Sequence, residues 1–155
     1  MRKILVAYFS ASGTTARLAK NIADTIGGDL FAIEPVEPYT AADLNWNNAQ
    51  SRSSVEMNDK SSRVAVAGRV ENMADYDTVL IGYPIWWGVA PHIINSFLEG
   101  YDLTGKTVIP FATSGGSGIG SPENYLKASA KGATLRSGKL LRVTAGEAEI
   151  KSLLR

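Results

Sequence analysis

The sequence contains no cysteine and only one histidine, His92, among its 155 residues. Without cysteine the chain has no disulfide, no thiolate metal site and no thiol redox chemistry. One histidine without a dense cluster of acidic residues gives no basis for a structural or catalytic metal site, and we expect none. We expect His92 itself to lie at the surface, in the first turn of a helix, without a catalytic role.

Long apolar runs and an excess of charge of either sign are missing too. The formal net charge is +1, which gives no bulk attraction to nucleic acid or to an anionic membrane. The apolar run near the N-terminus is six residues long, and no later run approaches the length that spans a bilayer. The chain length and the lack of a repeat or linker predict one domain over residues 1–155, which we expect to be soluble and cytoplasmic.

The rest of the chain is organised around its beginning. Residues 4–9 form an uninterrupted apolar run, which is typical of a buried parallel strand. A helical pattern starts soon afterwards, with Leu18, Ile22 and Ile26 on one face. The first turn of a helix has unpaired N–H groups and the positive end of the helix dipole, so it attracts anions. We therefore expect a phosphate to be held by the small and hydroxylated residues between strand and helix, which are Ser10, Ala11, Ser12, Gly13, Thr14 and Thr15.

This first loop lacks the residues that other phosphate sites need. It has no lysine for the β- and γ-phosphates of a nucleoside triphosphate, and it has one glycine where a dinucleotide fingerprint has three. A phosphatase with a cysteine nucleophile is excluded, and so is a receiver domain, because Tyr8 and Phe9 stand where acidic residues would be needed. We expect a monophosphate held by neutral donors without a cation. A plain helix start remains an equally simple interpretation of this loop alone.

Strands and helices alternate along most of the chain. Further strands are predicted at residues 30–33, 76–83, 107–112 and 134–141, and helices at residues 91–100, from residue 121, and at 144–154. Between residues 39 and 72 the pattern is weak, and there we expect a helix over 41–49, an irregular connection and a brief extended segment at 64–67. The alternation predicts a parallel sheet with helices on both faces.

Unusual residues also follow the third and fourth predicted strands. The second loop consists of Pro84, Ile85, Trp86, Trp87 and Gly88. The third loop begins with Thr113, Ser114, Gly115, Gly116, Ser117 and Gly118. The carboxyl ends of parallel strands lie at one edge of a sheet, which is where such sheets bind ligands. We therefore expect all three loops to meet there.

The second and third loops each have a simpler interpretation. Adjacent tryptophans often pack in a core or an interface. However, neighbours in a turn cannot both point into one core, so we expect either Trp86 or Trp87 to cover a ligand. The glycines after Ser114 could form a flexible linker, but loops between a strand and a helix are normally short. We interpret them as a backbone that approaches a planar, hydrogen-bonding ligand.

Together the three loops resemble those of flavodoxins and short flavodoxin-like FMN-binding proteins. The resemblance covers nearly the whole chain and is weakest over residues 40–72. It implies an α/β fold, a flavodoxin-like three-layer sandwich with a five-stranded parallel sheet in the order 2-1-3-4-5. It also implies FMN as the cofactor, with the phosphate in the first loop and the isoalloxazine ring between the second and third loops.

The function that this resemblance implies is low-potential electron transfer to and from redox partner proteins, without a catalytic side chain. Two features depart from that pattern. Flavodoxins that carry electrons are usually strongly acidic, and many place an aromatic residue of the third loop over the outer flavin face; this chain does neither. Unless Trp46 or Tyr125 covers that face, it is open to a nicotinamide or a quinone. The alternative is therefore a small FMN-dependent NAD(P)H:quinone-type reductase, and a third interpretation is a non-catalytic flavin-binding module.

Overall fold

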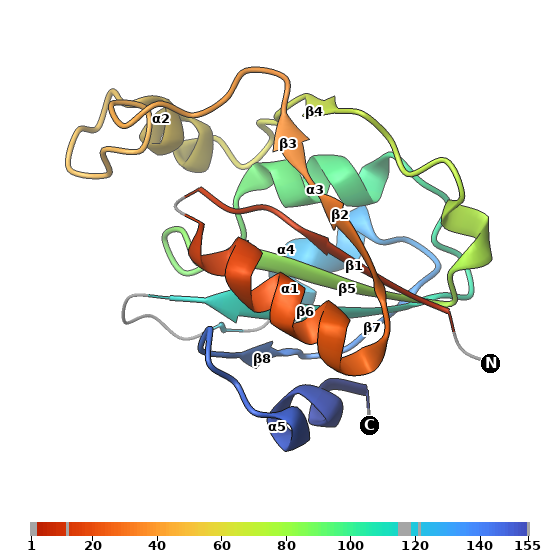
Figure 1. Ribbon diagram of the computed structural model, residues 1–155. Coiled ribbons are helices and arrows are strands. Elements are labelled where there is room, and N and C mark those ends of the chain that lie inside the picture. The colour runs from red at the N-terminus through yellow and green to blue at the C-terminus, as the bar shows by residue number, and fades with distance from the viewer. Residues whose placement is uncertain (1–2, 12, 115–118, 121, 155) are drawn as a thin grey trace.

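The computed structural model describes residues 3–11, 13–114, 119–120 and 122–154, which form an α/β structure around one main sheet (Figure 1). Its strands run parallel in the order β2-β1-β5-β6-β7, and β8 also pairs with β6. The bounds are β1 (Ile4–Tyr8), β2 (Asp29–Ala32), β5 (Thr78–Pro84), β6 (Thr107–Thr113), β7 (Thr134–Leu135) and β8 (Lys139–Leu140). With β7 and β8 taken as one interrupted strand, this is the predicted order 2-1-3-4-5, and the predicted fold class is confirmed.

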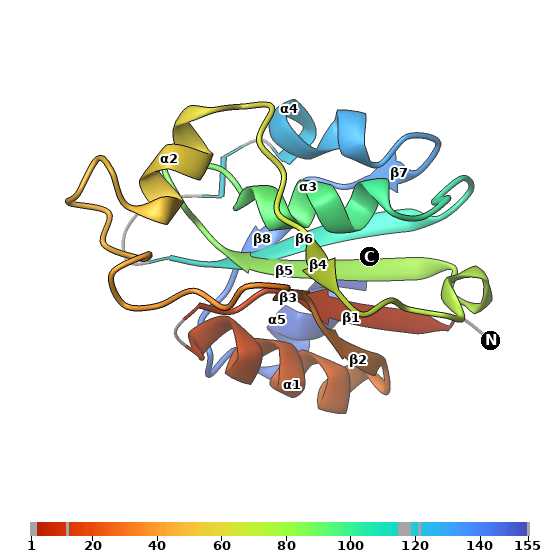
Figure 2. The ribbon, with the colours of Figure 1, turned by 90° about the horizontal axis from the view of Figure 1, so that it is seen from above.

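Helices cover both faces of this sheet (Figure 2). One face carries α1 (Thr14–Ile26) and α5 (Glu147–Lys151), and the other carries α3 (His92–Glu99) and α4 (Pro122–Leu126). Successive strand residues point to opposite faces, so Val6 and Leu80 pack in the α1 core while Leu5 and Ile81 pack in the α3 core. Short 3-10 helices lie at Met73–Asp75, Lys127–Ser129 and Ser152–Leu154.

The predicted helix after the first loop is α1, and its apolar face is buried as expected. Leu18 and Ile22 are fully buried against the sheet. The helix ends at Gly27, which has a φ of 72° and donates its N–H to the carbonyl of Ala23, a helix ending that favours glycine. No helix in the described part of the chain is long and apolar enough to cross a membrane.

The predicted strand over residues 134–141 is interrupted, and Pro110 of β6 gives the physical reason. The N–H groups of Arg136 and Leu141 bond to the carbonyls of Val108 and Ala112, on either side of Pro110. Proline has no N–H to donate at the position between them. A Cβ on Gly138 would lie 2.2 Å from the Pro110 carbonyl oxygen, so only a residue without a side chain lets the strand pass this point.

The helix predicted over residues 41–49 is wrong: this segment forms turns, and α2 lies at Arg52–Asn58. The side chains of Asn45 and Asn48 accept hydrogen bonds from N–H groups two residues further on, and such local bonds compete with a helix. The Ser51 hydroxyl caps α2 by accepting from the N–H of Ser54. Of the extended segment predicted at 64–67, only β4 (Val66–Ala67) is a strand, and it pairs antiparallel with β3 (Glu34–Pro35).

Candidate functional site

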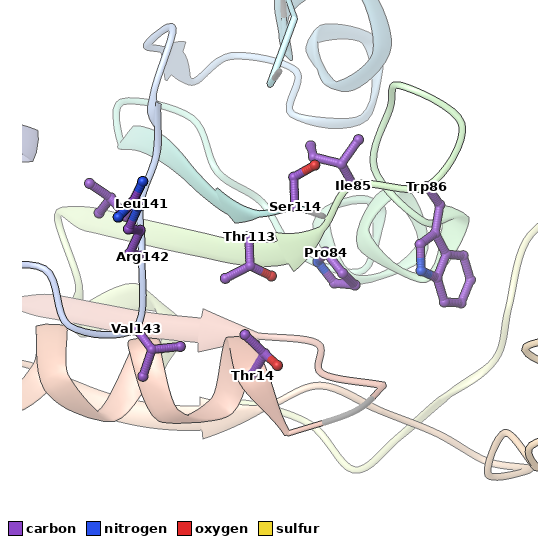
Figure 3. A pocket seen from close by; sticks show the side chains of 9 residues that line it. All are labelled: Thr14, Pro84, Ile85, Trp86, Thr113, Ser114, Leu141, Arg142 and Val143. Atoms are coloured by element: carbon purple, nitrogen blue, oxygen red, sulfur yellow. The ribbon is translucent and has the colours of Figure 1, made fainter. Parts of the chain in front are cut away.

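A cavity of about 430 Å³ opens at the carboxyl edge of the main sheet (Figure 3). It is formed by the start of α1 and by the segments that follow β5, β6 and β8. The lining residues are Thr14, Pro84, Ile85, Trp86, Thr113, Ser114, Leu141, Arg142 and Val143. Residues from all three predicted loops therefore line one pocket.

The first loop presents the start of α1 to this pocket. The Ser10 hydroxyl accepts a hydrogen bond from the N–H of Gly13, at 3.0 Å. Gly13 is the N-cap residue, with a φ of 92°, and no side chain of the described residues caps the helix. Thr14, the first helical residue, lines the pocket. A first turn without a side-chain cap keeps the N–H groups and the positive dipole end that attract an anion. Ala11 is half-buried, and Ser12 lies outside the described residues.

Thr15 points into the protein and joins the first loop to the third. Its side chain is only 1% exposed, and its hydroxyl oxygen lies 2.7 Å from that of Thr113 at the end of β6. Thr113 lines the pocket, whereas Thr15 lies beneath it. The pair fixes the start of α1 relative to the end of β6.

The second loop folds back on itself as a tight turn. The N–H of Trp86 donates to the carbonyl of Val89, and the N–H of Val89 donates to the carbonyl of Trp86. Trp87 and Gly88 between them have φ values of 50° and 79°, and two positive values are typical of a type I′ turn. Trp86 lines the pocket, while Trp87 is 51% exposed. The two indoles therefore point to different surroundings, as expected for neighbours in a turn.

Trp86 is held by two other aromatic rings. Its ring packs edge to face against Phe9, with centroids 5.6 Å apart, and against Tyr39, at 5.5 Å. Tyr39 in turn donates a hydrogen bond from its hydroxyl to Glu56 and lies under the guanidinium of Arg52. Burial, followed by the hydrogen bond to Glu56, raises the pKa of Tyr39, so the phenol is neutral. Trp86, Phe9 and Tyr39 thus form an aromatic wall of the pocket that is attached to α2.

The third loop contributes Thr113 and Ser114 to the lining, whereas Gly115, Gly116, Ser117 and Gly118 lie outside the described residues. Its far end is tied down by Tyr125, whose hydroxyl donates to the carbonyl of Ile119 at 2.7 Å and lies 3.0 Å from the buried hydroxyl of Tyr83. Tyr125 therefore anchors Ile119, at the far end of the third loop. Trp46 is the other residue that could cover the outer flavin face, and its side chain is 70% exposed.

Comparison with known proteins identifies the family. A family model described as Flavodoxin matches residues 3–155. The chain belongs to the flavodoxin family. The predicted resemblance is confirmed, and the fold is the flavodoxin-like, FMN-binding one.

Similar proteins of this family span a wide range of identity. The crystal structure of a candidate flavoprotein from Bacteroides eggerthii is 55% identical, with a TM-score of 0.93 over 99% of this chain and 96% of that one. A flavoprotein from Lactobacillus acidophilus, crystallised in complex with FMN, is 21% identical, with a TM-score of 0.71 and 100% of both chains covered; it shows a likeness of fold. The NAD(P)H dehydrogenase (quinone) of Archaeoglobus fulgidus is 30% identical over 139 residues, which are 88% of this chain and 69% of that protein.

Sequence reasoning missed the part of this flavodoxin's pocket that follows β8, namely Leu141, Arg142 and Val143. The first loop has no lysine, and a cation from another strand end was not expected. The available signal was topological: the fifth strand of a parallel sheet also ends at the ligand edge, and Arg142 is the first charged residue after that strand.

The expected surface position of His92 is wrong. Its side chain is only 9% exposed, and its Nδ1 lies 2.6 Å from the hydroxyl of Ser62. The Ser62 hydroxyl donates to the carbonyl of Glu56, so His92 donates from Nδ1 to Ser62. Burial, followed by the nearby charge of Arg63, lowers the pKa of His92, against smaller opposing effects of Glu56 and Asp59. The imidazole of His92 is therefore neutral, and its hydrogen bond to Ser62 holds the segment that follows α2.

We predict that the flavodoxin loses stability as the pH falls below about 6.5, the ordinary pKa of histidine, because the unfolded chain then binds a proton that buried His92 resists. The lowered pKa of His92 makes its stabilising contribution full above that pH and smaller below it. Urea unfolding at pH 7.5, 6.5 and 5.5 measures this. The His92→Gln variant should lose less stability over the same range, and identical losses in both proteins would contradict the assignment.

A second prediction concerns the threonine pair. Thr113→Val should lower the free energy of unfolding by about 1–3 kcal/mol, because the buried Thr15 hydroxyl loses its partner. Thr134→Val, at an exposed position of β7, is the control and should stay within about 0.5 kcal/mol. The Thr15→Val/Thr113→Val double variant should cost less than the sum of the single changes. Additive losses would mean that the two hydroxyls do not depend on each other.

Proposed function

We propose that this flavodoxin binds FMN in the pocket at the carboxyl edge of its sheet and acts as a low-potential electron carrier. FMN, when bound, accepts and donates electrons in steps of one or two. The observation that carries the proposal is one cavity that joins an uncapped helix start to an aromatic wall. The proposed binding residues in the described chain are Ser10, Ala11, Gly13, Thr14, Thr15, Pro84, Ile85, Trp86, Trp87, Gly88, Thr113 and Ser114.

The helix end of the pocket suits a phosphate. The N-cap residue of α1 is Gly13, which has no side chain, so a phosphate there would accept from the backbone and meet the positive end of the helix dipole. Thr14 adds a hydroxyl at the pocket wall. Thr15 acts from below, since its bond with Thr113 fixes the first loop against the end of β6.

The opposite end of the pocket suits a flat aromatic ring. Pro84 and Ile85 line it beside Trp86, whose ring is held edge to face by Phe9 and Tyr39. Because these rings already hold Trp86 in place, binding does not have to order its side chain, and this lower entropy cost favours binding. The same wall excludes water from the side of the ring that it covers.

Trp87 supports a role beyond holding the cofactor. Its φ of 50° is unusual for a residue that is not glycine, and the first position of such a turn favours asparagine, aspartate or glycine. Backbone strain of this kind costs about 1–3 kcal/mol and collects at functional sites. The indole is also half exposed beside the pocket. We propose that Trp87 contacts the redox partner or the substrate.

The second candidate function is an FMN-dependent NAD(P)H:quinone-type reductase. It is favoured by the 30% identity to the Archaeoglobus fulgidus protein named NAD(P)H dehydrogenase (quinone). The near-neutral net charge of +1 also differs from the strongly acidic surface by which electron carriers dock. A reductase would use small quinone and nicotinamide substrates, whereas a carrier would use redox proteins as partners.

The direct test is flavin binding. The purified protein should be yellow and should release FMN on unfolding. The apoprotein should bind FMN at least about tenfold more tightly than riboflavin, since a hydrogen bond to a charged group contributes about 1.5–3 kcal/mol. Quenching of flavin fluorescence measures both affinities. Equal affinity for the two flavins would mean that the site does not bind the phosphate. No binding of either flavin would reject the proposal.

Steady-state kinetics then separate the two functions. A carrier loaded with FMN should oxidise NADH and NADPH with a quinone acceptor no faster than free FMN at the same concentration. Oxidation that saturates with both nicotinamide and quinone would establish the reductase instead.

A further inference from the structure

Arg142 is the charged member of the pocket lining. Of the nine described residues that line the cavity, the other eight are uncharged. Arg142 is exposed to solvent and stands across the cavity from Trp86, with Thr113 and Ser114 between them (Figure 3). The pocket therefore has a cationic end and an aromatic end.

The backbone on both sides of Arg142 is fixed. Before it, Leu141 is buried in the α1 core and donates its N–H to the carbonyl of Ala112 in β6, at 2.9 Å. After it, the side-chain amide of Asn21 on α1 donates to the carbonyls of Val143 and Ala145, at 3.2 and 3.0 Å. Arg142 is thus tied to β6 and to α1, the two elements that border the phosphate end of the pocket.

The positive charges that line the pocket reinforce one another. The start of α1 carries a positive partial charge, and the Arg142 guanidinium lines the same pocket, so both would repel a cation and attract an anion. A guanidinium matches the oxygens of a phosphate with two parallel donors, and such hydrogen bonds are stronger than those between neutral groups. Neutral hydroxyls and a helix dipole alone would recognise a phosphate less strongly than the same groups with an arginine.

We propose that Arg142 determines specificity for the phosphorylated flavin by pairing with the same FMN phosphate that the start of α1 binds. The inference rests on the proposed FMN binding and replaces the expectation of a phosphate held without a cation. Arg142 adds affinity for FMN that riboflavin does not share, and this added affinity weakens with salt because the guanidinium is exposed to solvent.

The test compares Arg142→Gln with Arg17→Gln. Arg17 lies on the first turns of α1 and is exposed, but it does not line the pocket, so the control removes the same charge from a position outside the pocket. Affinities for FMN and riboflavin are measured by flavin fluorescence at about 20 mM and about 500 mM NaCl, concentrations at which charge screening is weak and strong. Far-ultraviolet circular dichroism checks that each variant is folded.

At low salt, Arg142→Gln should lower the affinity for FMN about tenfold and leave the affinity for riboflavin unchanged. Arg142→Lys keeps the charge without the planar guanidinium, so its affinity for FMN should lie between those of wild type and Arg142→Gln. Arg17→Gln should leave the FMN affinity within about twofold of wild type, since Arg17 does not line the pocket and an exposed charge acts through water of high dielectric constant. The difference in FMN affinity between wild type and Arg142→Gln should be smaller at high salt.

Two results would overturn the role of Arg142 while leaving FMN binding intact. One is an equal effect of Arg142→Gln and Arg17→Gln on FMN, which would mean that only net charge matters. The other is an equal loss of FMN and riboflavin in Arg142→Gln, which would mean that the residue shapes the pocket. If wild type binds neither flavin, the proposed function fails and the role of Arg142 fails with it.

Discussion

β1, β5 and β6 run parallel and side by side, so the loops that follow them leave the sheet at the same edge. This pairing brings segments about seventy and a hundred residues apart in the sequence to one cavity. The Thr15–Thr113 hydrogen bond then joins the first loop to the third directly. Without parallel pairing, neither that bond nor the shared lining of the pocket could form.

The residues at this edge are poorly suited to stability alone. The N-cap of α1 is Gly13, which lacks the few tenths of a kcal/mol that a capping side chain adds over glycine, and the Ser10 hydroxyl accepts from the N–H of Gly13 instead. Trp87 occupies a backbone conformation that favours asparagine or glycine. The buried cores on both faces of the sheet support these local costs, as is common at functional sites.

Sequence patterns predicted the parts of the molecule in which local chemistry agrees with the final structure. The apolar runs of β1, β5 and β6 and the amphipathic α1 are of this kind, and so is the meeting of three loops at one edge. Trp86 and Trp87 could not be told apart, because the turn from Trp86 to Val89 and the rings of Phe9 and Tyr39 decide which indole faces the pocket. The burial of His92 depends on a contact with Ser62, thirty residues away. Arg142 was missed for the same reason: its position follows from strand order and from Asn21, not from its neighbours in sequence.

In the proposed complex, this flavodoxin binds FMN with the phosphate at the start of α1 and the ring beside Trp86. The most direct measurement is a crystal structure of the protein with FMN bound. We expect phosphate oxygens within about 3 Å of backbone N–H groups in the first turn of α1, a hydrogen-bond distance, with the isoalloxazine ring against Trp86. An FMN whose phosphate points into solvent, or which occupies a different part of the surface, would show that this pocket does not hold the cofactor as proposed.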